Sequence, residues 1–280
     1  MCFYGSTMTM QELEIIFCLY RRLLLREPDV VGLHALMSHF QSPAERFDDL
    51  ITQFLESPEF KSKIHIFTRK YGGDLRFTND HSQHGEFAEI MKIFLDRGAH
   101  VKLVVDVGAN GKERSNSYDL LEHFGWRGIL VEANPALYPA IDKDFSGLDY
   151  ELVKTAVSDT TGRGLLALGV NSDISSLEST NTAQWWPISG NVEVVISRLP
   201  DILDERGVPH YFDLLSLDIE GFDVRVLNDL VCNSAYRPEV VIVEATTETG
   251  DLRSIGVATD VVEAYRITAT TKANLILQRT

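Results

Sequence analysis

The sequence predicts an α/β protein whose main domain is a doubly wound, mostly parallel sheet, with a small helical domain before it. Two observations lead to this fold class. Beyond residue 100, short apolar runs alternate with helix-like segments, which is typical of a parallel sheet covered on both faces. Before residue 72, apolar residues recur at helical spacing instead. We therefore expect a helical bundle at 1–72, a linker with an access helix at 73–100 and the α/β domain at 101–280.

The N-terminal segment carries repeated signals for helices. One face of a first helix is formed by Leu13, Ile16, Phe17, Tyr20, Leu23 and Leu24. Ser42-Pro43-Ala44-Glu45 is a capping box, and Ser57-Pro58-Glu59 repeats its Ser-Pro helix start. The segment 72–84 that follows is rich in Gly, Asp, Asn and Ser, which is typical of a linker or of a loop at the mouth of an active site.

In the main domain we expect strands at 103–105, 129–131, 152–153, 214–217 and 240–243, with a helix at 118–124. Two β-rich runs at 265–270 and 274–278 predict a terminal hairpin. A long insertion separates the third strand from the fourth. Its polar run 171–176 and its aromatic pair Trp185-Trp186 suit a loop that covers a substrate, although an ordinary packed pair of tryptophans fits them equally well.

Composition excludes several classes of function. The chain has 26 basic and 41 acidic residues, a formal net charge of −15, which repels a nucleic-acid backbone. No apolar run is long enough to cross a bilayer and no leader-like segment opens the chain, so we expect a cytoplasmic location. Cys2, Cys18 and Cys232 form no CxxC pair, which argues against a disulfide framework or a structural zinc site.

A glycine-containing turn directly follows the first predicted strand, and an open α/β sheet binds its ligand at this place. In this turn Gly108 and Gly111 allow the backbone to approach a ligand closely, and Asn110 suits an unusual backbone conformation. Asp106 precedes the turn, and Ser115 or Asn116 can cap the helix that follows it. We therefore expect a cofactor site here.

Glu132 ends the second strand, at the separation typical of an acid that binds ribose hydroxyls, with Ala133 and Asn134 after it. This spacing fits S-adenosylmethionine or a dinucleotide. Two features favour S-adenosylmethionine: no glycine stands two positions after Gly108, and Asp106 would repel a pyrophosphate but attract a sulfonium ligand with a free amino group.

The end of the third strand reads Ala156-Val157-Ser158-Asp159. Its small apolar residues can form a wall for an adenine ring, and Ser158 and Asp159 can contact the ring's polar edge. The alternative is turn chemistry, because Thr160, Thr161 and Gly162 follow.

Several motifs in this order resemble the FkbM-type methyltransferases. They are Ser82-Gln83-His84-Gly85-Glu86, Asp106-Val107-Gly108-Ala109-Asn110, Ser115-Asn116-Ser117-Tyr118, Gly125-Trp126-Arg127-Gly128, Val131-Glu132-Ala133-Asn134-Pro135, Leu217-Asp218-Ile219-Glu220-Gly221 and Asn274-Leu275-Ile276-Leu277. The resemblance covers residues 80–280 and implies a class I methyltransferase fold that binds S-adenosylmethionine, with Gln83 and His84 as contacts in the access loop. The first segment resembles a helical domain often attached to bacterial glycan-modifying enzymes. One departure is that Asn110 is followed at once by Gly111, where many relatives have an extra residue.

The fourth strand delivers acids to the same edge of the sheet. Asp218 is the expected general base, and Glu220 is a second catalytic candidate; the alternative is that both only start a helix. Glu244 ends the fifth strand, so Asp218, Glu220 and Glu244 can together bind a divalent cation, although we favour a reaction without a metal. His81, His84 and His210 are alternative bases.

These residues predict an enzyme that transfers a methyl group from S-adenosylmethionine to an oxygen of a glycan or small-molecule acceptor. Two alternatives remain open at this point. One is an NAD-dependent oxidoreductase or epimerase on a similar sheet, and the other is a methyltransferase fold that binds partners without catalysis.

Overall fold

The computed structural model describes residues 16–17, 19–21, 27–30, 53–54, 56–60, 80–169, 175–177, 187–247 and 249–280. The chain divides into two compact units, Met1–Thr78 and Asn79–Thr280. This boundary falls inside the segment predicted as the linker and access helix. The helix of that segment, α5 (Glu86–Arg97), is part of the second unit.

In the first unit, the described residues include one of the predicted helix starts. The Ser57 hydroxyl accepts a hydrogen bond from the backbone N–H of Phe60 at 3.1 Å, as the Ser-Pro start predicts. The rings of Tyr20 and Phe54 meet edge to face with their centroids 5.0 Å apart. The capping box at 42–45 lies outside the described residues, so the helical bundle stays a prediction.

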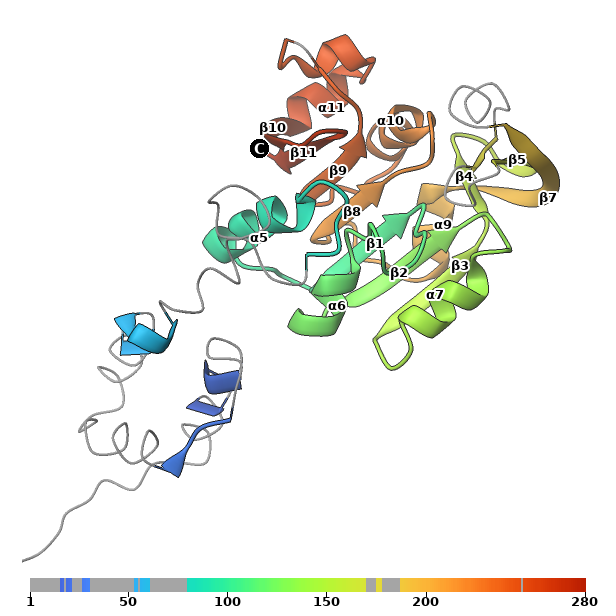
Figure 1. The fold of residues 1–280 in the computed structure, drawn as a ribbon. Helices are drawn as coiled ribbons and strands as arrows, with labels where there is room; N and C mark the ends of the chain where they lie inside the picture. The colour runs from blue at the N-terminus through green and yellow to red at the C-terminus, as the bar shows by residue number, and fades with distance from the viewer. Residues whose placement is uncertain are drawn as a thin grey trace, which may run out of the picture. The chain divides into compact units, whose positions relative to one another are not determined.

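A seven-stranded sheet forms the centre of the second unit (Figure 1). Its parallel strands are β1 (Leu103–Val107), β2 (Arg127–Glu132), β3 (Tyr150–Lys154), β8 (Leu214–Leu217) and β9 (Val240–Glu244). Next to β9, the antiparallel pair β11 (Asn274–Arg279) and β10 (Tyr265–Thr270) completes the order β10-β11-β9-β8-β1-β2-β3. The doubly wound sheet and the terminal hairpin are thus confirmed, and the strand order reverses between β1 and β8.

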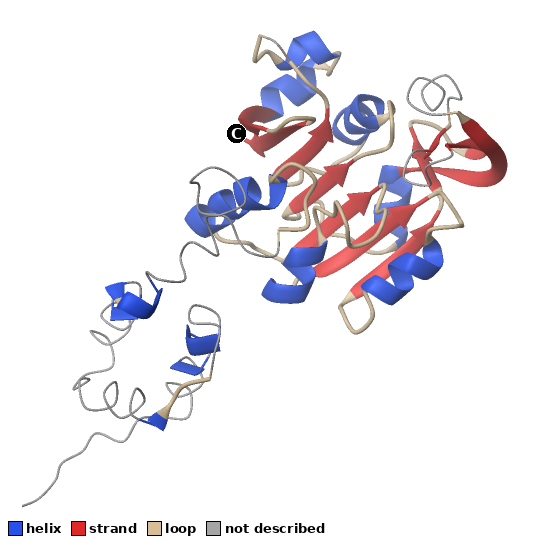
Figure 2. Ribbon diagram, viewed as in Figure 1, coloured by secondary structure: helices blue, strands red, loops and turns tan. Residues whose placement is uncertain are grey.

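Helices cover both faces of this sheet (Figure 2). Residues of α5, α6 (Tyr118–Phe124) and α7 (Tyr138–Asp144) pack in one core. Residues of α9 (Leu199–Glu205), α10 (Asp223–Asn233) and α11 (Thr259–Ala264) pack in the other, which also includes Leu252 of a short 3₁₀ helix (Leu252–Ile255). Successive residues of a strand point to opposite faces, so Val104 belongs to the first core and Val105 to the second.

A second sheet occupies much of the insertion between β3 and β8. It has the order β4-β7-β5-β6 and consists of β4 (Ala156–Ser158), β7 (Ile188–Arg198), β5 (Gly162–Gly169) and β6 (Ser175–Ser176). The sequence analysis predicted no strands in this insertion, so it missed β5 and β7. The signal was present in β7, where Val192, Val194 and Ile196 alternate with more exposed residues and pack on Leu166 and Ala156. Residues 171–174 and the pair Trp185-Trp186 lie outside the described residues.

No helix in the described part of the chain is long and apolar enough to cross a membrane. Cys232 is a free thiol on the surface, whereas Cys2 and Cys18 lie outside the described residues.

Candidate functional site

A cavity opens at the carboxyl ends of β1, β2, β8 and β9, where the strand order reverses. Most of the residues predicted from the sequence line it: Gln83, Asp106, Gly108, Asn110, Ser115, Glu132, Ala133, Asp218, Glu220 and Glu244. The predicted contacts Gly111, Asn134, Ser158 and Asp159 are absent from its lining.

The glycine turn brings the ends of β1 and β8 into contact. Gly108 has φ +90°, and its N–H donates to the carbonyl of Val131 at 2.9 Å. The N–H of Asp218 donates to the carbonyl of Val107 at 3.0 Å. A Cβ atom on Gly108 would lie 1.9 Å from the carbonyl oxygen of Asp218. Only glycine allows this approach, which places the predicted base beside the predicted cofactor turn.

Asp106 lies at the base of the cavity in a network of hydroxyl groups. Its side chain is buried, and the Ser117 hydroxyl donates to Oδ2 at 2.5 Å. The Ser216 hydroxyl also donates to this carboxylate. Burial raises the pKa of Asp106, while the two hydroxyl donors oppose this shift. Asn116 joins the network because its Nδ2 donates to the Ser216 oxygen at 3.1 Å.

Glu132 ends β2 on the other side of the turn. Its side chain is buried, and Oε1 accepts the backbone N–H of Asn134 at 2.6 Å. Burial raises the pKa of Glu132 to about 7, and the charge of Asp106 adds to this shift. Asn134 supports the turn, since its own Oδ1 accepts the N–H of Ala136 at 3.0 Å.

Ser115 and Gly111 shape the segment between the turn and α6. The N-cap residue of α6 is Ser117, so the predicted cap at Ser115 or Asn116 was wrong. The Ser115 hydroxyl lines the cavity and accepts the backbone N–H of Tyr118, the first residue of α6, at 2.9 Å. Gly111 has φ +126° and lies outside the cavity, near the Asp144 carboxylate. Its structural role is to turn the backbone.

The access loop, which carries Gln83 just before α5, is fixed by contacts with segments that are distant in the sequence. Ser82 forms an isolated β-bridge with Arg114, which follows the glycine turn. The buried Glu86 carboxylate accepts hydrogen bonds from the Thr271 hydroxyl at 2.5 Å and from Asn274 Nδ2 at 2.9 Å. Gln83, between these two anchors, is held at the cavity.

Asp159 does not line the cavity and pairs with α10. Its carboxylate accepts two hydrogen bonds from Arg225 of α10, at 2.9 and 3.1 Å, and Ser158 donates to it at 3.0 Å. The apolar residues before them, Ala156 and Val157, do line the cavity. Of the residues predicted to contact adenine, the apolar ones thus line the cavity, whereas Ser158 and Asp159 do not.

Of the candidate histidines, none lines the cavity. His81 Nδ1 is 2.8 Å from Oδ1 of the buried Asp119. His210 packs edge to face on Tyr236, with ring centroids 5.1 Å apart.

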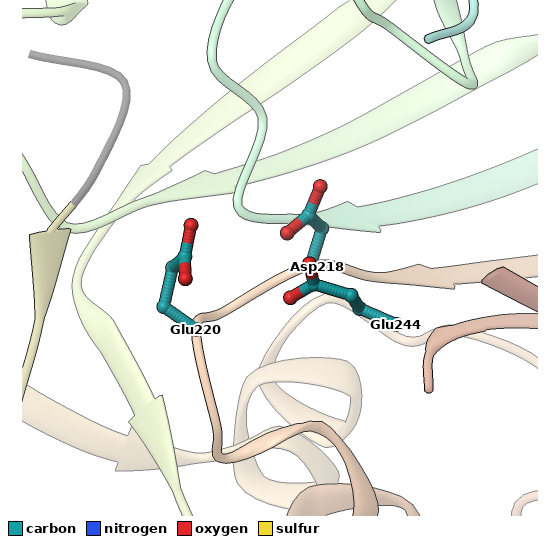
Figure 3. A group of neighbouring side chains, drawn as sticks. All are labelled: Asp218, Glu220 and Glu244. Carbon is teal, nitrogen blue, oxygen red and sulfur yellow. The ribbon is translucent and has the colours of Figure 1, made fainter. Parts of the chain in front are cut away.

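Three carboxyl groups that line the cavity lie close together (Figure 3). Asp218 follows β8, Glu244 ends β9, and Glu220 lies in the loop between β8 and α10 with φ +51°. Oxygen atoms of the three groups all lie within 4.8 Å of one another. Burial raises the pKa of Asp218 well above its usual range, and the nearby Glu244 carboxylate raises it further. Burial and neighbouring acids raise the pKa values of Glu220 and Glu244 to about 7. The cluster can hold a proton near neutral pH or ligate a divalent cation.

The loop that carries Glu220 is held from two sides. The buried Asp223 carboxylate accepts the N–H groups of Ile219 at 2.9 Å and Gly221 at 3.1 Å. From the second sheet, the Ser176 hydroxyl donates to the carbonyl of Glu220 at 3.0 Å. The left-handed conformation of Glu220 is thereby fixed by hydrogen bonds.

Sequence reasoning gave no chemical role to Asn116, Ser176 or Ser216, although all three line the cavity. The run Ser115-Asn116-Ser117 directly after the glycine turn was the available signal for Asn116. Ser216 is a polar residue inside an apolar strand, which is a comparable signal.

Comparisons with known proteins identify a family for the second unit. A family model described as the methyltransferase FkbM domain matches residues 106–263. Among solved structures, a candidate RNA methyltransferase from Pyrococcus horikoshii matches with 12% sequence identity and a TM-score of 0.37, covering 79% of this chain and 99% of that one. A search of curated proteins finds no match.

Proposed function

The chain belongs to the FkbM methyltransferase family, and from this membership we propose that it transfers a methyl group from S-adenosylmethionine to an oxygen of a glycan or small-molecule acceptor. One observation carries the proposal. Glu132 at the end of β2 and Asp218 at the end of β8 face the same cavity, on either side of the Gly108 turn. This arrangement offers a ribose ligand and a base around one ligand site.

The residues of the cavity fit S-adenosylmethionine. Glu132 would accept hydrogen bonds from the ribose hydroxyls, and the apolar Leu137, Ala156 and Val157 would contact the adenine ring. The cavity also contains several carboxyl groups, which suit a ligand with a positive sulfonium and a positive ammonium group. Oδ1 of Asn116 is buried and accepts no hydrogen bond from the residues that the structure describes. It would therefore accept a hydrogen bond from the ligand.

When bound, S-adenosylmethionine supplies an electrophilic methyl group. Asp218 would take the proton of the acceptor hydroxyl as the new oxygen–carbon bond forms and the sulfur–carbon bond breaks. The carboxyl groups of Glu220 and Glu244 hold this proton near the cavity, because all three acids lie close together. Asp218 must be ionised to act, and its pKa is raised, so the rate should increase with pH from the acid side through neutrality.

Isothermal titration with S-adenosylhomocysteine and with NAD tests the cofactor. We expect wild-type protein to bind S-adenosylhomocysteine and not NAD, and we expect Glu132→Ala to abolish that binding. Asp159→Ala is the matched control, because this carboxylate pairs with Arg225 outside the cavity and its removal should leave the affinity unchanged. Binding of NAD without S-adenosylhomocysteine would refute the methyltransferase and support the oxidoreductase.

Incubation of cell extract with S-adenosylmethionine carrying a deuterated methyl group then tests turnover and identifies the acceptor. Mass spectrometry should reveal one component that gains a single labelled methyl, and Asp218→Asn should lower its rate by about 10² to 10⁴. We expect the reaction to persist in EDTA. Loss in EDTA with recovery in Mg²⁺ would instead assign Asp218, Glu220 and Glu244 to a metal site, and binding without any turnover would support a catalytically inactive module.

A further inference from the structure

We propose that Asn116 binds the α-ammonium group of S-adenosylmethionine through its side-chain carbonyl oxygen. The inference rests on the proposed function and deepens it, because it assigns a residue to the amino-acid end of the cofactor. It starts from a side chain that is 9% exposed, lines the cavity and has a buried oxygen without a hydrogen-bond donor among the described residues. A buried acceptor of this kind costs free energy unless a ligand or water supplies a donor.

The hydrogen-bond network determines which end of the Asn116 amide is left without a partner. The Ser216 hydroxyl uses its single proton to donate to the Asp106 carboxylate. Its oxygen must therefore act as the acceptor toward Asn116, so the group 3.1 Å away is the amide nitrogen Nδ2. Oδ1 is then the buried acceptor of this cavity-lining residue that is left without a donor among the described residues. Asp106 also lines the cavity, and its carboxylate orients Ser216 and through it Asn116.

The position of Asn116 in the sheet indicates which part of the cofactor it meets. Asn116 is bonded to β8, whereas Glu132 belongs to β2, and β1 lies between these two strands. The apolar wall for adenine lies on the β2 side, where Ala156 packs with Ala133. With adenine and ribose on that side, the methionine portion extends toward β8 and Asn116. Oδ1 accepts but does not donate, so it suits the ammonium group and not the carboxylate.

The test compares ligands that differ only at the amino-acid end, using isothermal titration of the full chain. The probes are S-adenosylhomocysteine, its analogue without the α-amino group, and 5′-methylthioadenosine, which lacks the whole amino-acid portion. In wild-type protein, removal of the amino group should weaken binding at least tenfold. In Asn116→Ala, affinity for S-adenosylhomocysteine should fall by a similar factor, its preference over the amino-free analogue should disappear, and affinity for 5′-methylthioadenosine should stay within twofold.

Asn191→Ala, an exposed substitution on β7, is the matched control and should leave all three affinities unchanged. Retained binding of 5′-methylthioadenosine shows that Asn116→Ala is folded. If the variant misfolds, Asn116→Leu, which lacks an acceptor, and the wild-type comparison of the two homocysteine ligands decide instead. The inference is overturned if wild-type protein does not discriminate the amino group, or if an Asn116 variant keeps that discrimination or loses affinity for all three ligands equally. Failure of wild-type protein to bind S-adenosylhomocysteine at all overturns the proposed function itself.

Discussion

At the scale of single residues, the site depends on one position without a side chain. Gly108 touches the carbonyl of Asp218, and this contact sets how closely the cofactor turn approaches the acids after β8. At Glu132, by contrast, the surroundings of the side chain determine its chemistry. Burial keeps its pKa at about 7, so a ligand that donates hydrogen bonds to the carboxylate stabilises the charged form.

We predict that Gly108→Ala lowers affinity for S-adenosylhomocysteine at least tenfold and destabilises the fold, because the new methyl group would meet a backbone carbonyl that cannot move independently. Gly125→Ala is the matched control. Gly125 also has positive φ, at +64°, but has open space around its Cβ position, so only the conformational cost of about 1–2 kcal/mol is expected there. Calorimetric binding and chemical denaturation measure both effects; equal results for the two variants would contradict the role of the contact.

At the scale of secondary-structure elements, β1 and β8 are aligned at their starts as well as at their ends. The buried carboxylate of Asp213, just before β8, accepts the N–H groups of His100 at 2.6 Å, Val101 at 3.0 Å and Leu103 at 3.2 Å. These bonds fix the start of β1 beside the start of β8. The register that follows pairs Asp106 with Ser216, which places the hydroxyl network and the glycine turn.

We predict that Asp213→Ala lowers the free energy of unfolding by about 3 kcal/mol, since it leaves three backbone donors near the sheet without an acceptor. Asp213→Asn retains one carbonyl oxygen of similar shape and should cost less. Urea denaturation followed by circular dichroism gives both values. The register argument fails if the two variants are equally stable, or if Asp213→Ala is as stable as wild type.

The sequence predicted the strands of the central sheet but not those of the second sheet. The strands β1, β8 and β9 were predictable because each is a buried apolar run bounded by turn residues. The terminal hairpin was predictable because two β-rich runs flank a short turn. The second sheet was missed, although β7 alternates, because Ile188 and Val195 are exposed, and because β5 begins and ends with glycine and has a further glycine at position 164. Its link to the site, from Ser176 to the carbonyl of Glu220, joins residues 44 positions apart and has no local signature.

At the scale of the whole molecule, acidic residues outnumber basic ones, and several acidic side chains line the cavity. The net charge of −15 is accompanied by a cavity in which Glu132, Glu220 and Glu244 each have a pKa of about 7. For each of these groups the folded state holds a proton more tightly than the unfolded state. Stability from such a group is fully present below its unfolded pKa and is lost as the pH rises through the folded value.

We therefore predict that the free energy of unfolding of the ligand-free protein falls as the pH rises from about 5 to about 7.5, which thermal denaturation in a series of buffers will measure. The variant Glu132→Gln/Glu220→Gln/Glu244→Gln should show a flatter dependence, because the groups that release protons are gone. Glu193→Gln, at an exposed position of β7, should leave the slope unchanged. A wild-type stability that rises over this interval would contradict the raised pKa values.

The sequence by itself determined the doubly wound sheet and the gathering of Asp106, Glu132 and Asp218 at one edge of it. Local apolar periodicity fixes the strands, and the carboxyl ends of parallel strands share an edge. The tertiary structure alone decided which polar groups face the cavity. Asp159 pairs with Arg225, 66 residues away, and Asn116 bonds Ser216, 100 residues away. Such partners depend on strand register and helix position, which no local pattern encodes, and they leave the buried Asn116 oxygen without a donor among the described residues.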